Sequence, residues 1–256
     1  MMDITKQLIA QKESGQKAFV PYIVAGAHGL DALEETILNL QSLGATALEI
    51  GIPYSDPVAD GPVIRTVGGR ALQNGVTLSS VLETVARLSD RVHIPLFFMT
   101  YVNTIFVYGV ERFAKRCSEV GIRGVIIPDL PFEERGLVQE AFRTYEIANV
   151  PLVALTSDEE RMAAIVREAE GFIYAVTING VTGRQVEASA TADHFATLQR
   201  LTDLPIYAGF GITTAEDVDA MNAQADGVIV GTAIVRALEE GQSEAIEALF
   251  GAKSLK

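Results

Sequence analysis

Short runs of apolar residues recur along the whole 256-residue chain. Each run is followed by a loop rich in Gly, Pro or Asp, and then by a stretch whose apolar positions have helical spacing. Strands that alternate with helices in this way are typical of a parallel sheet in an α/β protein. The pattern predicts eight strands, at residues 18–24, 47–50, 96–100, 124–127, 151–155, 172–176, 205–209 and 227–230.

Helices are predicted between these strands, and several begin at an Asp, Ser or Thr that can cap free backbone amides. Residues 1–17 predict one extra N-terminal helix. Eight repeats that close on themselves form a (β/α)8 barrel, also called a TIM barrel. A doubly wound open sheet is the alternative, but it would show fewer strands and a glycine-rich nucleotide turn after the first one. The other predicted helices span residues 30–43, 78–88, 111–120, 133–145, 158–169, 192–201, 214–222 and 234–249.

Composition narrows the classes of protein that remain. A hydrophobic content of 48% over this length is enough for one large core, and no linker or change of composition divides the chain, so we expect a single domain over residues 1–256. There is no secretory signal pattern and no apolar run of roughly 20 residues, which predicts a soluble cytoplasmic protein. A formal net charge of −13 argues against binding to nucleic acids or anionic membranes.

Metal and disulfide chemistry are not expected. Cys117 is the single cysteine, and the three histidines, His28, His93 and His194, are scattered without a partner at ligand spacing. The net negative charge also limits how a phosphorylated substrate could be bound. Local backbone amides and helix ends would have to bind the phosphate, because the overall field of the protein repels anions.

Glu49 is the most unusual residue of the predicted strands. It is flanked by Leu48 and Ile50, and a charge in such an apolar strand costs several kcal/mol unless it is paired or its pKa is shifted. Two interpretations remain open from this feature alone: a proton-transferring group, or a carboxylate that accepts hydrogen bonds from backbone amides. Two further acids, Asp56 and Asp60, follow in the next loop.

Glycines follow the last three predicted strands, at residues 180–183, 209–211 and 231. Glycine lets the backbone approach an anion closely, and Thr232 adds a hydroxyl donor at the start of a predicted helix. Barrels commonly bind phosphate at the loops after strands seven and eight, where this chain has no Lys or Arg. The sequence therefore predicts a phosphate site built from amides.

Residues 48–61, LEIGIPYSDPVADG, resemble the signature of the tryptophan synthase alpha subunit. The resemblance extends over nearly the whole chain. Further segments resemble that family in the same order, at residues 19–26, 126–131, 172–174, 180–184, 209–212 and 226–231.

The resemblance implies a (β/α)8 barrel that cleaves indole-3-glycerol phosphate into indole and glyceraldehyde 3-phosphate in tryptophan biosynthesis. The chain itself needs no cofactor, whereas its implied partner, a beta subunit in an alpha2-beta2 tetramer, holds pyridoxal phosphate. The implied catalytic pair is Glu49 and Asp60, and the implied substrate contacts are Tyr101 and Tyr174. The implied phosphate contacts are Gly183, Phe210, Gly211, Gly231 and Thr232.

The chemistry of the cleavage agrees with these residue types. A retro-aldol step needs a proton at indole C3, stabilisation of positive charge at the ring nitrogen and removal of a hydroxyl proton, and two carboxylates can serve all three. We expect Asp60 to stay ionised and to take the indole N–H, and Glu49 to have a raised pKa and to shuttle protons.

Three alternatives remain. The chain could be a stand-alone indole-releasing lyase, or a barrel without turnover that activates a partner, although the presence of both acids speaks against the latter. A different aldolase or isomerase would commonly use a Lys Schiff base or a His, and neither stands at a predicted strand end.

Overall fold

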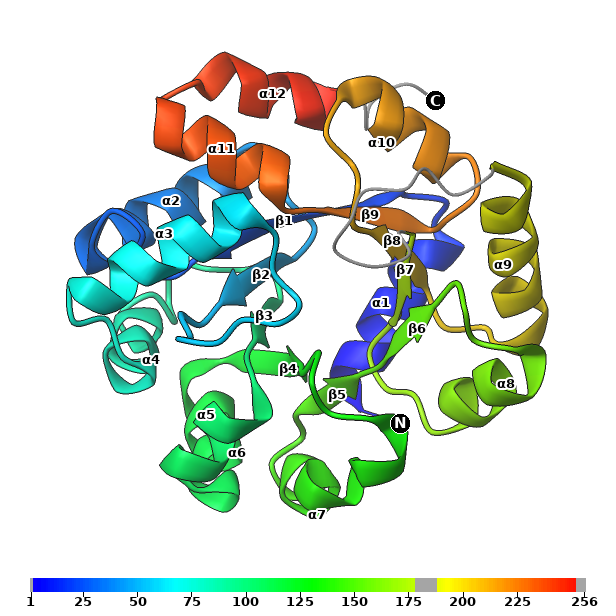
Figure 1. Cartoon of the computed structure of the whole chain (residues 1–256), viewed down its shortest axis with the longest axis horizontal. Helices are drawn as coiled ribbons and strands as arrows, with labels where there is room; N and C mark the ends of the chain where they lie inside the picture. Colours follow the sequence, from blue (N-terminus) through cyan, green and yellow to red (C-terminus); the bar gives the residue numbers. More distant parts are fainter. Residues whose placement is uncertain (1, 178–187, 252–256) are drawn as a thin grey trace. The chain divides into compact units, whose positions relative to one another are not determined.

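The computed structural model describes residues 2–177 and 188–251, excluding the side chains of residues 188–190 (Figure 1). The chain divides into two compact units. The middle unit is Pro21–Asn149, and the terminal unit combines Met1–Val20 with Val150–Lys256. The expected single domain stays a prediction.

The middle unit consists of parallel strands joined through helices. Strands β1 to β4 pair in chain order, and β5 lies beside β4. Every residue of β1, β2 and β3 is buried, as expected for strands with helices packed against them. The elements are β1 (Ala18–Val24, from Pro21 onward in this unit), α2 (Leu30–Ser42), β2 (Leu48–Gly51), α3 (Pro62–Gln73), α4 (Leu78–Ala86), β3 (Leu96–Met99), α5 (Val102–Tyr108), α6 (Val110–Val120), β4 (Ile122–Ile126), the 3-10 helix η1 (Phe132–Glu134), α7 (Gly136–Thr144) and β5 (Ala148–Val150, up to Asn149 in this unit).

The terminal unit repeats the same pattern. Its strands lie in the order β9-β8-β7-β6, with parallel pairing, and the backbone N–H of Ala18 at the start of β1 donates to the carbonyl oxygen of Asp226 just before β9. The elements are α1 (Asp3–Glu13), β6 (Leu152–Ala154), α8 (Glu159–Arg167), β7 (Ile173–Val176), α9 (Ala188–Leu201), β8 (Ile206–Gly209), α10 (Ala215–Asn222), β9 (Gly227–Val230), α11 (Thr232–Glu240) and α12 (Ser243–Gly251).

Helix starts follow the capping residues that the sequence offers. Thr77 and Thr214 form reciprocal capping boxes at α4 and α10, and the Asp158 carboxylate accepts a hydrogen bond from the Arg161 amide at 2.8 Å.

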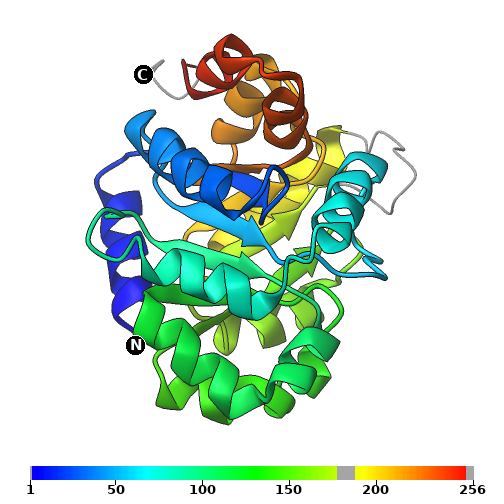
Figure 2. The same cartoon turned by 90° about the vertical axis from the view of Figure 1, so that its left-hand side faces the viewer.

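In the middle unit α2, α4, α6 and α7 pack in a row, which Figure 2 shows from blue to green. These four helices therefore form one continuous packed row in the middle unit.

All eight predicted strands are present, and two of them, residues 18–24 and 227–230, have the predicted bounds. The structure also corrects several predictions. Pro151 separates the additional strand β5 from β6, because proline has no N–H for a continuous ladder. The single helix predicted at residues 234–249 is two helices, α11 and α12, since Gly241 ends α11 in a left-handed conformation.

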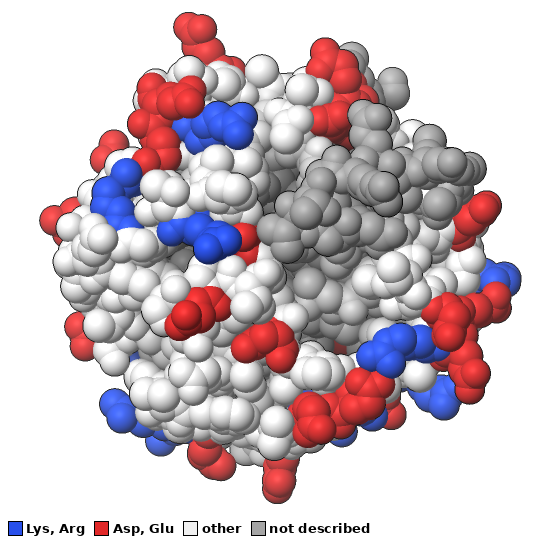
Figure 3. Space-filling model, in the orientation of Figure 1, with Lys and Arg blue, Asp and Glu red and all other residues white. Residues whose placement is uncertain are grey.

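Charged side chains lie in small groups on the face that Figure 3 shows. On the face in Figure 3, acidic side chains lie among basic ones, and the described residues form no broad basic area there. Among residues 2–177 and 188–251, no helix is both long and apolar enough to cross a membrane. The expected cytoplasmic location stays a prediction.

Candidate active site

Glu49 lies in the middle of β2, beside Tyr22 of β1 and Phe97 of β3 in the strand register. Its side chain is 1% exposed, and neither carboxyl oxygen has a hydrogen-bond partner among the described residues. Burial, together with the nearby charge of Asp60, raises the pKa of Glu49 from 4.5 to about 8. Of the two interpretations left open by the sequence, the carboxylate tied by backbone amides is therefore excluded within the described part of the chain.

Asp60 ends the loop that follows β2, and Tyr101 holds that loop. The Tyr101 hydroxyl accepts a hydrogen bond from the Ala59 amide at 3.1 Å and donates one to the Asp60 carboxylate. The Tyr54 ring stacks on the Tyr101 ring at a centroid distance of 4.8 Å. Burial raises the pKa of Asp60 to about 6, although the Tyr101 hydrogen bond and the charge of Arg65 counteract part of this rise. Asp60 is therefore mostly ionised above pH 6.

Tyr101 is itself held by the next loop of the middle unit. It precedes α5, and the Asp129 carboxylate after β4 accepts a hydrogen bond from the Val102 amide at 2.9 Å. This bond satisfies one of the free amides at the start of α5. Burial and the charge of Asp60 raise the pKa of Tyr101, so its hydroxyl stays protonated and can donate to Asp60.

Tyr22 is a site residue that the sequence argument missed. The space where a Cβ atom on Gly51 would lie is filled by the Tyr22 hydroxyl, only 2.1 Å from that position, so any larger residue at 51 would displace the ring. Burial, then the charges of Asp60 and Glu49, raise the pKa of Tyr22. The available signal was the alternation of β1, which places Tyr22 and Val24 on one face of the strand.

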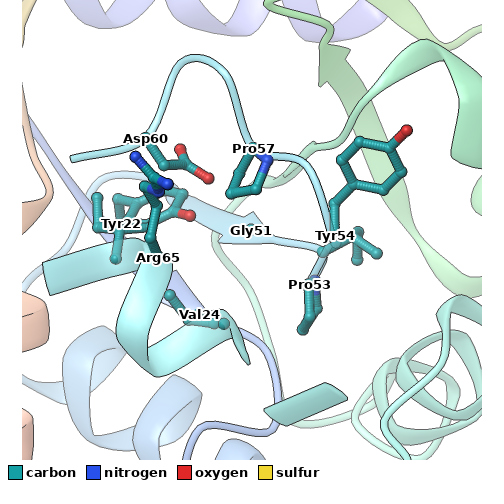
Figure 4. A pocket seen from close by; sticks show the side chains of 11 residues that line it. Tyr22, Val24, Gly51, Pro53, Tyr54, Pro57, Asp60 and Arg65 are labelled. Carbon is teal, nitrogen blue, oxygen red and sulfur yellow. The ribbon is translucent and has the colours of Figure 1, made fainter. Parts of the chain in front are cut away.

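A pocket in the middle unit opens beside these groups. Figure 4 shows the Asp60 carboxylate next to the Arg65 side chain, with the Tyr22 ring close to both. Glu49 lies two residues before Gly51, and therefore on the same face of β2. The pocket is lined by Tyr22, Val24, Gly51, Ile52, Pro53, Tyr54, Pro57, Asp60, Ile64, Arg65 and Gly68.

The terminal unit contains three predicted site residues: Tyr174 within β7, and Phe210 and Gly211 directly after β8. Phe210 and Gly211 have φ angles of 73° and 77°, two consecutive left-handed residues directly after β8. For a non-glycine residue such as Phe210 this conformation costs about 1–2 kcal/mol. The Tyr174 ring fills the space beside Gly209 and contacts the Phe210 ring at a centroid distance of 5.7 Å. Strain of this kind is often found at functional sites.

Gly231 and Thr232 form the start of α11. Gly231 is the N-cap residue and makes no side-chain cap, so the first amides of the helix have no capping side chain. Such an end attracts anions through its free N–H groups and the helix dipole. Gly183, the remaining predicted phosphate contact, lies outside the described residues.

Comparison with known proteins decides the family. The family model described as tryptophan synthase alpha chain matches residues 8–254 of this chain. The tryptophan synthase alpha chain of Streptococcus pneumoniae (strain Taiwan19F-14) is 47% identical over 242 residues, which cover 93% of each chain. The chain belongs to the tryptophan synthase alpha chain family.

Solved structures of alpha chains agree with this assignment. Tryptophan synthase subunit alpha from Campylobacter jejuni matches with a TM-score of 0.84 and 38% identity, covering 94% of this chain and 96% of its own. The subunit alpha from Legionella pneumophila str. Paris matches with a TM-score of 0.88 and 31% identity, covering 99% and 96% of the two chains. The predicted (β/α)8 barrel class and the predicted carbon–carbon lyase of tryptophan biosynthesis are confirmed by this membership.

No metal-binding cluster is found in the described part of the chain. Residues 2–177 and 188–251 contain no group of three or more His, Cys, Asp or Glu side chains that could hold a metal ion. Cys117 is buried, and burial raises the pKa of its thiol, which makes it a poor nucleophile.

Proposed function

We propose that this chain cleaves indole-3-glycerol phosphate by a retro-aldol reaction in which Glu49 and Asp60 transfer and stabilise protons. The observation that supports this proposal best is the buried Glu49 carboxyl. It has no hydrogen-bond partner among the described residues, and its pKa of about 8 lies well above that of Asp60, about 6. Near pH 7 the pair therefore holds one proton on Glu49 and a negative charge on Asp60, the state that the reaction needs at its start.

The proposed steps return both carboxyls to their starting state. Protonated Glu49 donates its proton to indole C3 while ionised Asp60 accepts the ring N–H and stabilises the developing positive charge. The Glu49 carboxylate then removes the proton of the C3′ hydroxyl. The C3–C3′ bond breaks as the aldehyde forms, its electron pair restores the indole ring, and Glu49 is again protonated.

The phosphate end of the substrate is assigned to the glycine-rich loops of the terminal unit. The Phe210–Gly211 turn and the uncapped start of α11 supply backbone amides. Amide donors agree with a chain whose net charge of −13 repels anions at long range. Tyr174, packed against Phe210, is proposed as the aromatic contact beside this turn.

A beta subunit is the proposed partner, in an alpha2-beta2 tetramer with pyridoxal phosphate held by the beta chain. Four large apolar side chains of the described middle unit are exposed: Val58 at 70%, Phe106 at 44%, Val107 at 81% and Leu137, in α7, at 50%. Val58 lies in the loop that bears Asp60, and that loop is bonded through Ala59 to Tyr101, directly before the helix that carries Phe106 and Val107. A partner that covered these side chains would also contact the loop that positions Asp60.

The deciding experiment measures indole release from indole-3-glycerol phosphate by the purified chain, with and without a beta subunit. We expect weak release by the chain alone and strong activation on addition of the beta subunit. Full activity without any activation would favour the alternative, a stand-alone indole-releasing lyase. The absence of release under both conditions would rule out both lyase proposals.

The pH dependence of cleavage tests the proton assignment. We expect kcat/KM to be bell-shaped, falling below about pH 6 as Asp60 becomes protonated and above about pH 8 as Glu49 loses its proton. The midpoints of the two limbs give the apparent pKa values of the coupled pair. Tyr101→Phe is the matched variant, because it removes the hydrogen bond that lowers the pKa of Asp60. Its acid limb should move to higher pH, and a profile that is flat from pH 5 to 9 would contradict the assignment.

The phosphate site makes a separate prediction. Gly211→Asp should raise KM for indole-3-glycerol phosphate by more than about tenfold, because it places a negative charge at the proposed amide site and a non-glycine residue at a φ of 77°. Steady-state kinetics with the phosphorylated substrate measure the change. An unchanged KM would remove the turn after β8 from the site.

A further inference from the structure

We propose that Thr177 is a positioning residue that orients the phosphate-binding amides of Phe210 and Gly211. The inference rests on the proposed function of this turn and deepens it. Thr177 directly follows β7, and the turn directly follows β8, its neighbour in the sheet of the terminal unit. Neither the sequence patterns nor the family resemblance singled out this threonine.

Thr177 contacts both carbonyl groups of the turn. Its hydroxyl oxygen lies 2.8 Å from the Gly209 carbonyl oxygen and 2.5 Å from the Phe210 carbonyl oxygen. The backbone N–H of Thr177 also donates to the Gly209 carbonyl, at 3.0 Å. Because a hydroxyl has one proton, it can donate to the Phe210 carbonyl while the backbone N–H of Thr177 donates to the Gly209 carbonyl.

The planar peptide bond converts these contacts into a direction for the amides. In a trans peptide the C=O and the following N–H point opposite ways. When Thr177 draws the carbonyls of Gly209 and Phe210 toward itself, the N–H groups of Phe210 and Gly211 therefore point away from it, side by side. Successive amides in such a turn form a concave nest that suits an anion.

The conformation of Phe210 explains why the turn needs a stabilising hydrogen bond. A left-handed φ of 73° is unfavourable for phenylalanine, and the preferred conformations would rotate the peptide that follows it. The Thr177 hydroxyl opposes that rotation by holding the Phe210 carbonyl, and the Tyr174 ring packs against the Phe210 side chain. Thr177 thus acts on phosphate through the backbone of its neighbour, without contacting the ligand itself.

Thr177→Val tests this role because valine keeps the shape of threonine and removes only the hydroxyl. We expect KM for indole-3-glycerol phosphate, and the Kd of the full chain for inorganic phosphate, to rise by roughly 3- to 10-fold, the range of one lost hydrogen bond. The value of kcat should change by less than about twofold, because Glu49 and Asp60 are untouched. Thr177→Ser retains the hydroxyl and should restore values near those of the wild type.

Thr202→Val is the matched control. It removes a hydroxyl that accepts a hydrogen bond from the Leu204 amide, before the amino end of β8 rather than after its carboxyl end. It should leave both KM and the phosphate Kd unchanged. Thr177→Ala, measured in the same way, replaces Thr177→Val if circular dichroism shows that the valine variant does not fold.

The outcomes separate this inference from the proposed reaction. Unchanged KM and Kd in Thr177→Val, no detectable phosphate binding by the wild type, or a serine variant as impaired as valine would overturn the role of the hydroxyl. If the wild type released no indole but its phosphate Kd still responded to Thr177→Val and recovered in Thr177→Ser, the lyase proposal would fail while the positioning role held.

Discussion

Glu49→Gln is expected to lower kcat for indole-3-glycerol phosphate cleavage by about 10²- to 10⁴-fold, the usual contribution of a general acid–base group. Glutamine has nearly the same size but cannot donate a proton to indole C3 or accept one from the C3′ hydroxyl. Stopped assays of indole release measure the loss. The control is Glu140→Gln, the same chemical change at an exposed position of α7. Turnover within tenfold of the wild type would contradict the proposed role of Glu49.

The same variant has a second, independent readout in stability. The folded-state pKa of Glu49, about 8, lies above its unfolded value near 4.5, so the folded protein binds the proton more tightly than the unfolded chain. This group contributes its full stabilisation below about pH 4.5 and loses it as the pH rises through 8. The free energy of unfolding of the wild type should therefore fall by several kcal/mol relative to Glu49→Gln between pH 5 and pH 8. Parallel urea titrations at both pH values would show whether it does.

Asp60→Asn is expected to reduce kcat by about 10²- to 10³-fold, the scale on which removal of a preorganised electrostatic group slows a reaction. Asparagine can still accept a hydrogen bond from the ring nitrogen but carries no charge to stabilise the positive ring. The variant should also lower the pKa of Glu49, because the charge of Asp60 raises that pKa in the wild type. The alkaline limb of the residual activity would then move to lower pH.

One control variant and one direct pKa measurement make the Asp60 result specific. Arg65→Gln removes a positive charge that lowers the pKa of Asp60, so the acid limb of its pH profile should move to higher pH. In Asp60→Asn, by contrast, the alkaline limb should move to lower pH. Carbon-13 NMR of labelled glutamate gives the pKa of Glu49 directly. An unchanged Glu49 pKa in Asp60→Asn would show that the two carboxyls act independently, and unchanged kcat would exclude Asp60 from the reaction.

Much of the fold follows from local rules that act along the sequence. Strand bounds such as residues 18–24 were predictable because buried parallel strands are continuous apolar runs between turn signals. Capped helices such as α8 were predictable because the capping residue, Asp158, directly precedes the helix in the sequence. The helix α5 was missed, since its start depends on a carboxylate from Asp129, 27 residues further along the chain. A distant cap leaves no local pattern.

The sequence by itself indicated the barrel class, through its alternating strands and helices, and its resemblance at residues 48–61 indicated the family and implied the proposed pair Glu49 and Asp60. Only the tertiary structure decided the pKa values and the hydrogen-bond partners of these groups. The pKa of Glu49 depends on complete burial and on the charge of Asp60. The pKa of Asp60 depends on burial and on the hydrogen bond from Tyr101. The Phe210 carbonyl accepts a hydrogen bond from the Thr177 hydroxyl, which lies directly after the neighbouring strand β7. Desolvation, charge coupling and hydrogen bonds act through space, between residues that only folding brings together.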